Sequence, residues 1–152
     1  MSGDDKTRWD RQHGLSSGAD QPSGFLRQVL ESDAWHIPHG LALDVATGKG
    51  RNAIFLAEMG FRVVGLDIST IALEEARRRA AEKSLEISWH VADLEQIELP
   101  AAAYNLIVNF NYLQRSLVPQ IRRALKPEGH VIFETYLVDQ QAIGHPKIPP
   151  TC

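Results

Sequence analysis

The sequence contains one cysteine, Cys152, its last residue. A single cysteine excludes an internal disulfide framework and a cysteine-ligated metal cluster. No uninterrupted apolar run approaches the ~20 residues that a membrane-spanning helix needs. The polar, acidic segment Met1–Asp5 lacks the features of a secretory signal. With 43% hydrophobic residues, the chain is therefore expected to be a globular cytoplasmic protein with no membrane partner.

The sequence also lacks a large excess of charge of either sign, because it has 16 lysines and arginines and 19 acidic residues. A net charge of −3 argues against a nucleic-acid-binding surface as the main function. The basic run Arg77–Arg79 follows Glu74 and Glu75 at helical spacing, which is typical of a solvated helix face. The six histidines have no metal-ligand spacing. We expect neither a nucleic-acid partner nor a metal.

The length of 152 residues suits one domain with one core. Residues 1–20 are polar and are predicted to form a flexible N-terminal arm or lid. Residues 21–141 carry the alternating apolar segments of a folded domain. Residues 142–152 include three of the eight prolines and are predicted to form an irregular tail, because proline cannot donate to a sheet.

Strand and helix patterns alternate along the domain. We expect helices after Pro22, at 50–59, from Ser69 or Thr70 to about 83, and at 117–125, and a turn at 126–129. The expected strands are 41–45, 62–66, 87–91, 104–110 and 130–136. Alternation of this kind indicates an α/β fold, a doubly wound parallel sheet with right-handed crossovers.

Three carboxylates lie where expected strands end. Asp44 ends the first strand and opens a glycine-containing loop, Asp67 follows the second strand, and Asp93 follows the third. Ligands of doubly wound sheets bind at the carboxyl ends of the strands. A carboxylate at position 67 can accept two hydrogen bonds from the vicinal hydroxyls of a ribose. The pattern therefore predicts a nucleoside-containing cofactor at this edge.

Two kinds of cofactor compete for that edge. Residues 48–53 match the dinucleotide pattern G-x-G-x-x-G/A, and Asp67 stands where the ribose-binding acid should be. This favours an NAD(P)-dependent oxidoreductase. Asp44 weighs against it, since a carboxylate there would repel a pyrophosphate and attract an ammonium group. Asp93 could also accept a hydrogen bond from an adenine amino group.

The successive segments 43–50, 65–69, 92–94 and 125–129 resemble the motifs of class I S-adenosylmethionine-dependent methyltransferases, in the same order and spacing across about 38–137. The resemblance implies a Rossmann-like sheet of order 3-2-1-4-5. Gly50-Arg51-Asn52 and Trp9-Asp10 resemble the bacterial small-molecule branch that includes tellurite-resistance and thiopurine methyltransferases. The function implied is methyl transfer from S-adenosylmethionine to a small-molecule acceptor.

The resemblance also assigns residues to the cofactor. The loop would cradle the methionine portion, with Asp44 near its amino group, through Asp44, Ala46, Gly48 and Gly50. Ala46 replaces the usual first glycine, which an L-residue tolerates if its φ is negative. Asp67 would bind the ribose hydroxyls, and Ile68 would pack on the adenine. Asp93 and the backbone N–H of Leu94 would meet the edge of the adenine.

Asn109 and Phe110 would close the methionine side, largely through backbone atoms. Four further residues are candidates for the acceptor side: Trp9, His13, Tyr112 and Arg115. Arg115 could pair with an anionic acceptor. No catalytic residue is assigned, because a soft anionic acceptor needs no general base.

The family's sheet normally has seven strands, whereas five are expected here, so the sequence predicts a C-terminally truncated methyltransferase. The edge of the fifth strand, Val131–Phe133, would then be exposed and open to pairing. A homo-oligomer formed through this edge is one way to cover it. An inactive cofactor-binding remnant and a subunit completed by a partner are the alternatives to an active enzyme.

Overall fold

The computed structural model describes residues 21–32, 34–110 and 115–134. The predicted arm (1–20), the predicted tail (142–152) and residues 135–141 lie outside this range. Within the described residues, no helix is long and apolar enough to cross a bilayer.

A five-stranded sheet forms the centre of the molecule. Its order is β3-β2-β1-β4-β5 and every neighbouring pair is parallel, as predicted. The strands are β1 (Leu41–Val45), β2 (Arg62–Asp67), β3 (Ser88–Val91), β4 (Tyr104–Phe110) and β5 (Leu125–Glu134). The order reverses between β1 and β4, and such a switch point opens a crevice beyond the strand ends.

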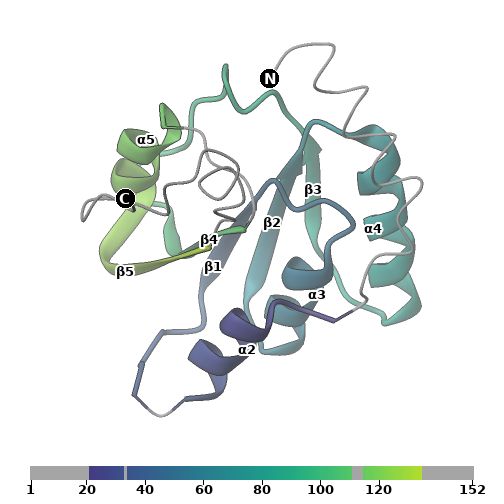
Figure 1. The fold of residues 1–152 in the computed structure, drawn as a ribbon, viewed down its shortest axis with the longest axis horizontal. Helices are drawn as coiled ribbons and strands as arrows, with labels where there is room; N and C mark the ends of the chain where they lie inside the picture. The colour runs from purple at the N-terminus through teal and green to yellow at the C-terminus, as the bar shows by residue number, and fades with distance from the viewer. Residues whose placement is uncertain (1–20, 33, 111–114, 135–152) are drawn as a thin grey trace, which may run out of the picture.

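Helices cover both faces of the sheet, as crossover connections between parallel strands require. They are α2 (Gly24–Glu31), α3 (Arg51–Glu58), α4 (Thr70–Glu82) and α5 (Leu117–Ala124). Figure 1 shows α3 and α4 on one side of the sheet and α5 on the other. Ser23 and Ser69 start α2 and α4, since each side chain accepts a hydrogen bond from the backbone three residues on.

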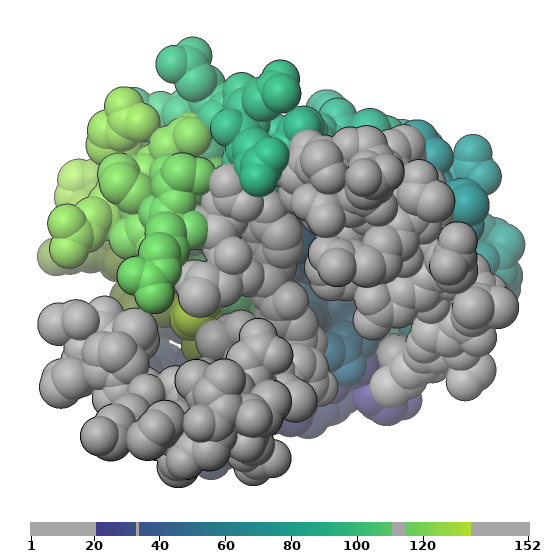
Figure 2. All heavy atoms as spheres, turned by 45° about the horizontal axis from the view of Figure 1, so that its top comes forward, coloured from purple at the N-terminus to yellow at the C-terminus, as the bar shows by residue number. Residues whose placement is uncertain are grey.

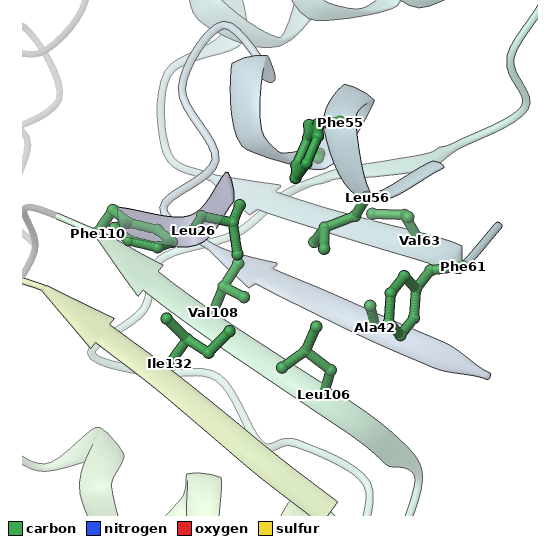
Figure 3. Close-up of a cluster of buried hydrophobic side chains, with 11 residues drawn as sticks. Leu26, Ala42, Phe55, Leu56, Phe61, Val63, Leu106, Val108, Phe110 and Ile132 are labelled. Atoms are coloured by element: carbon green, nitrogen blue, oxygen red, sulfur yellow. The ribbon is translucent and has the colours of Figure 1, made fainter. Parts of the chain in front are cut away.

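One hydrophobic cluster fills the space between the sheet and the α2–α3 layer. Leu106 and Val108 of β4 and Ile132 of β5 point to the same side as Leu26 and Leu56 (Figure 3). Leu26, Leu56, Leu106 and Val108 have no exposed surface. Full burial of such a side chain stabilises the fold by roughly 1.5–3 kcal/mol.

A second cluster lies on the other side, against α5. Val45 of β1 and Ile107 of β4 pack there with Leu117 and Ile121 of α5. Ile107 alternates with Leu106 and Val108, so β4 is buried on both faces. This explains its near-continuous apolar sequence.

The turn predicted at residues 126–129 does not lie between α5 and β5. The structure includes them in β5, which begins at Leu125. The pairing with β4 nevertheless passes from Tyr104–Leu125 to Leu106–His130, so four residues loop out of the ladder. Glu128 has φ +67°. The turn residues therefore make an irregularity inside a strand that starts earlier than predicted.

Candidate functional site

The expected site residues gather at the carboxyl ends of the central strands. Val45 of β1 pairs with Leu66 of β2 and with Asn109 of β4. Asp67 of β2 pairs with Val91 of β3. Asp44, Asp67, Asp93 and Asn109 thus lie at or just beyond one edge of the sheet, because parallel strands end on the same side.

The loop from β1 to α3 reverses the chain in five residues. Ala46 has φ +59°, Gly48 φ +59° and Gly50 φ +81°. The loop is held by Thr47, whose N–H donates to the Leu66 carbonyl at 2.7 Å and whose carbonyl accepts from the Gly50 N–H at 3.0 Å. The condition of a negative φ at Ala46 is therefore not met. The reversal imposes a left-handed conformation there, at a cost of roughly 1–2 kcal/mol for a residue with a Cβ.

Gly50 has a packing role in addition to its place in the loop. A Cβ at this position would lie 2.7 Å from the Trp89 ring and 3.0 Å from the Ala76 Cβ. Trp89 belongs to β3 and Ala76 to α4. The third residue of the glycine motif therefore lets α3 begin close against its neighbours, where any larger residue would collide.

Asp44 is almost fully buried, with 2% of its surface exposed. Its Oδ2 accepts a hydrogen bond from the Thr47 hydroxyl at 2.7 Å. Burial raises the pKa of Asp44 to about 7; the Thr47 hydrogen bond and the nearby Arg51 oppose this rise, and Asp67 adds to it. Asp44 thus holds the loop from inside. Its predicted proximity to a ligand ammonium stays a prediction.

Asn at position 44 is expected to make stability less dependent on pH. The pKa of the Asp44 carboxyl rises from 3.8 in the unfolded chain to about 7 in the folded chain. Between these values the folded chain keeps a proton that the unfolded chain has lost, so stability falls as pH rises through this window. The loss is on the order of 4 kcal/mol. In urea unfolding from pH 4 to 8, Asp44→Asn should gain on the wild type as pH rises; parallel pH profiles would contradict this.

Asp67 is buried and ties three segments together. Its Oδ2 accepts from the Gly48 N–H at 2.8 Å and its Oδ1 from the Ser69 N–H at 2.8 Å. Its carbonyl accepts from the Ala92 N–H at 2.9 Å. Each carboxylate oxygen has a second lone pair. Asp67 can therefore accept one further hydrogen bond at each oxygen.

The loop after β3 carries the third carboxylate. Asp93 Oδ1 accepts from the Glu95 N–H at 3.0 Å. Leu94 and Ile68 are 1% and 8% exposed, and both side chains pack in the cluster on the α5 side. The predicted contact of the Leu94 N–H with a ligand needs only its backbone, so the buried side chain is compatible with it.

Asn109 and Phe110 end β4 in different surroundings. The Oδ1 atom of Asn109 is buried and has no hydrogen-bond partner among the described residues. A buried carbonyl oxygen without a partner is costly, and a bound ligand, water or ion that donates to it would remove this cost. Phe110 instead packs in the α2–α3 cluster (Figure 3). Only its backbone is available to the site.

The acceptor-side predictions are mostly untested. Trp9, His13 and Tyr112 lie outside the described residues. Arg115 is exposed just before α5, and its carbonyl accepts from the Val118 N–H at 3.2 Å. Thr47 is a site residue that was not predicted. It lies three residues after Asp44, a spacing at which a hydroxyl can donate to a carboxylate.

Residues 42–129 match the family model described as "Methyltransferase domain". The ubiquinone biosynthesis O-methyltransferase of Nitrosococcus oceani is 33% identical over 99 residues, covering 61% of this chain and 42% of that protein. The ribosomal protein L11 methyltransferase of Thermus thermophilus is 31% identical over 117 residues, covering 75% and 46%. The chain thus spans less than half the length of these relatives.

Solved structures show the same fold. The S-adenosylmethionine-dependent methyltransferase from Mesorhizobium loti superposes with a TM-score of 0.60 at 28% identity, covering 72% of this chain and 50% of that one. A structure concerning conversion of a disulfide bond into a thioacetal group during echinomycin biosynthesis superposes with a TM-score of 0.72 at 22% identity, covering 84% and 59%.

Proposed function

Because the chain belongs to the methyltransferase domain family, we propose that it binds S-adenosylmethionine at the carboxyl edge of its sheet and transfers the methyl group to a small molecule. Hydrogen-bond acceptors lie together at this edge: Asp67, Asp93 and Asn109 Oδ1, which has no partner in the part of the chain that the structure describes. The cofactor presents donors and positive charge, namely two ribose hydroxyls, an adenine amino group, an ammonium and a sulfonium. This match between acceptors and donors is the observation that carries the proposal.

Each end of the cofactor has residues to receive it. The remaining lone pairs of Asp67 suit the ribose hydroxyls. Ile68 and the Asp93–Leu94 backbone would form the adenine side. The loop that Asp44 braces would hold the methionine end, together with Asn109, whose Oδ1 would gain the partner that it lacks among the described residues.

The cofactor, when bound, supplies an activated methyl group. The chain then has to orient an acceptor in line with that group and exclude water. Asn109 and Arg115 flank the segment between β4 and α5, which begins at the switch point of the sheet. An exposed arginine there suits an anionic acceptor. We therefore favour a small acceptor with a soft, anionic nucleophile, of the kind methylated by tellurite-resistance and thiopurine methyltransferases.

Thermal unfolding with S-adenosylmethionine, S-adenosylhomocysteine, NAD and NADP tests cofactor binding. A ligand at about 100 times its dissociation constant stabilises the folded state by roughly 2.7 kcal/mol, which raises the melting temperature by several degrees. We expect this shift with the two S-adenosyl ligands and none with the nicotinamides. A cooperative melt that neither S-adenosyl ligand moves would refute the proposal, and a shift with NAD alone would favour the oxidoreductase.

Transfer is tested separately, with radiolabelled S-adenosylmethionine and thiol, selenide and tellurite acceptors. Label in one of these acceptors supports the full proposal. If ribosomal protein, added in place of these small acceptors, became labelled instead, the acceptor would be a protein. Binding without any transfer would favour the alternatives of a cofactor-binding remnant or a subunit completed by a partner.

A further inference from the structure

One side chain of α5 clasps the loop that follows β3. The Leu99 N–H donates to Gln120 Oε1 at 2.8 Å, and Gln120 Nε2 donates to the Ile97 carbonyl at 2.7 Å. Both halves of the amide are thus engaged, and both bonds are partly buried. The reciprocal pattern fixes the orientation of the amide as well as its position.

The clasped loop has little regular structure of its own. Residues 94–103 form no helix and no strand. The loop is held at its start by the Ala92 N–H, which donates to the Asp67 carbonyl at 2.9 Å, and at its end by the Ala103 N–H, which donates to the Ala124 carbonyl at 2.8 Å. Between these two ends Gln120 bonds to Ile97 and Leu99, whose side chains also pack against the hydrophobic cluster on the α5 side. The Ala102 N–H donates to the Arg123 carbonyl at 2.7 Å. Figure 2 shows the loop, in teal-green at the top, beside α5.

The same loop carries Asp93 and Leu94, the two residues that would meet the adenine edge. Leu94 is 1% exposed and packs in the same cluster as Leu117 and Ile121 of α5. The loop is therefore held in two ways, by packing of Leu94, Ile97 and Leu99 in the cluster on the α5 side and by the two hydrogen bonds of the Gln120 amide. Loss of the clasp would remove both hydrogen bonds and leave residues 97–99 held by packing, with less restriction on their backbone.

We infer that Gln120 is a positioning residue for nucleobase recognition. Its two hydrogen bonds fix the loop and thereby the positions of the Asp93 side chain and the Leu94 N–H. In these positions the two groups select a 6-aminopurine. The inference rests on the proposed function. Asp93 can accept from an amino group at purine position 6, and the Leu94 N–H can donate to an unprotonated ring nitrogen at position 1. A 6-oxopurine presents an acceptor and a donor in those places, so a rigid loop rejects it.

The test compares S-adenosylhomocysteine with S-inosylhomocysteine, which differs only in having oxygen in place of the 6-amino group. Their dissociation constants are measured by calorimetry for the wild type, Gln120→Leu and Gln96→Leu. Gln96 is an exposed glutamine in the same loop, so it is the matched control. We expect the wild type and Gln96→Leu to prefer the adenine ligand by about tenfold or more. Gln120→Leu should reduce that ratio at least about fivefold.

Several outcomes separate the inference from the function on which it rests. An unchanged ratio in Gln120→Leu, even with a lower melting temperature, would overturn the inference and leave a purely structural clasp. A wild type with no preference between the ligands would overturn it too, with cofactor binding intact. A wild type that binds neither ligand would refute the proposed function itself. Should Gln120→Leu fail to fold, Gln120→Glu takes its place; it keeps an acceptor for the Leu99 N–H, but replaces the donor to the Ile97 carbonyl by a negatively charged oxygen.

Discussion

Replacing Asp67 by alanine is expected to reduce the affinity for S-adenosylhomocysteine at least about 100-fold. The variant loses two acceptor positions for the ribose hydroxyls, and hydrogen bonds to a charged group contribute roughly 1.5–3 kcal/mol each. It also frees the Gly48 and Ser69 N–H groups, which Asp67 holds at 2.8 Å. Titration calorimetry measures the affinity directly.

Two controls separate ribose binding from the shape of the loop. Glu86→Ala removes an exposed carboxylate and should leave the affinity unchanged. The 2′,3′-dideoxy analogue of S-adenosylhomocysteine should bind the wild type much more weakly than the parent ligand, whereas Asp67→Ala should bind both alike. If Asp67→Ala still preferred the ligand with hydroxyls by the wild-type ratio, the assignment of Asp67 to the ribose would be wrong.

The substitution Gly50→Ala is expected to destabilise the fold by about 2–5 kcal/mol. Its φ of +81° costs a residue with a Cβ roughly 1–2 kcal/mol. Overpacking against the Trp89 ring, 2.7 Å from the new Cβ, adds roughly 1–3 kcal/mol. The free energy of unfolding is measured in urea without ligand, so the result is independent of the proposed function.

Gly24→Ala is the matched control for that experiment. Gly24 begins α2, and a Cβ there would meet nothing within 4 Å. This substitution should stabilise the protein by about 0.4–1 kcal/mol, because alanine restricts the unfolded chain. Combining Gly50→Ala with Trp89→Leu should cost less than the two changes separately. Strict additivity of the two would mean that the ring does not contact the new Cβ.

Much of the architecture follows from local patterns in the sequence. The apolar run of β4 reflects burial on both faces, and the stretches at 41–45 and 62–66 have the same character. Serine caps mark the starts of α2 and α4. Such signals need only the period of a strand or helix and the chemistry of its ends. The alternation of strands and helices then leads to the parallel sheet and brings Asp44, Asp67 and Asp93 to one edge.

The tertiary structure decided which contacts the side chains at that edge make. Asp44 points inward to Thr47, Gly50 makes room for Trp89, and Ala46 has a positive φ because the loop must reverse within a few residues. Asn105 accepts from the Leu41 N–H at 3.1 Å, a link of 64 positions.

The sequence by itself thus determined the order of the elements and the edge where the carboxylates meet, since hydrophobic period and capping are properties of neighbouring residues. Only the tertiary structure decided the clasp of Gln120, the irregularity in β5 and the unpaired Asn109 Oδ1. Each of these depends on which distant backbone atoms come within about 3 Å. No local period in the sequence encodes such distances.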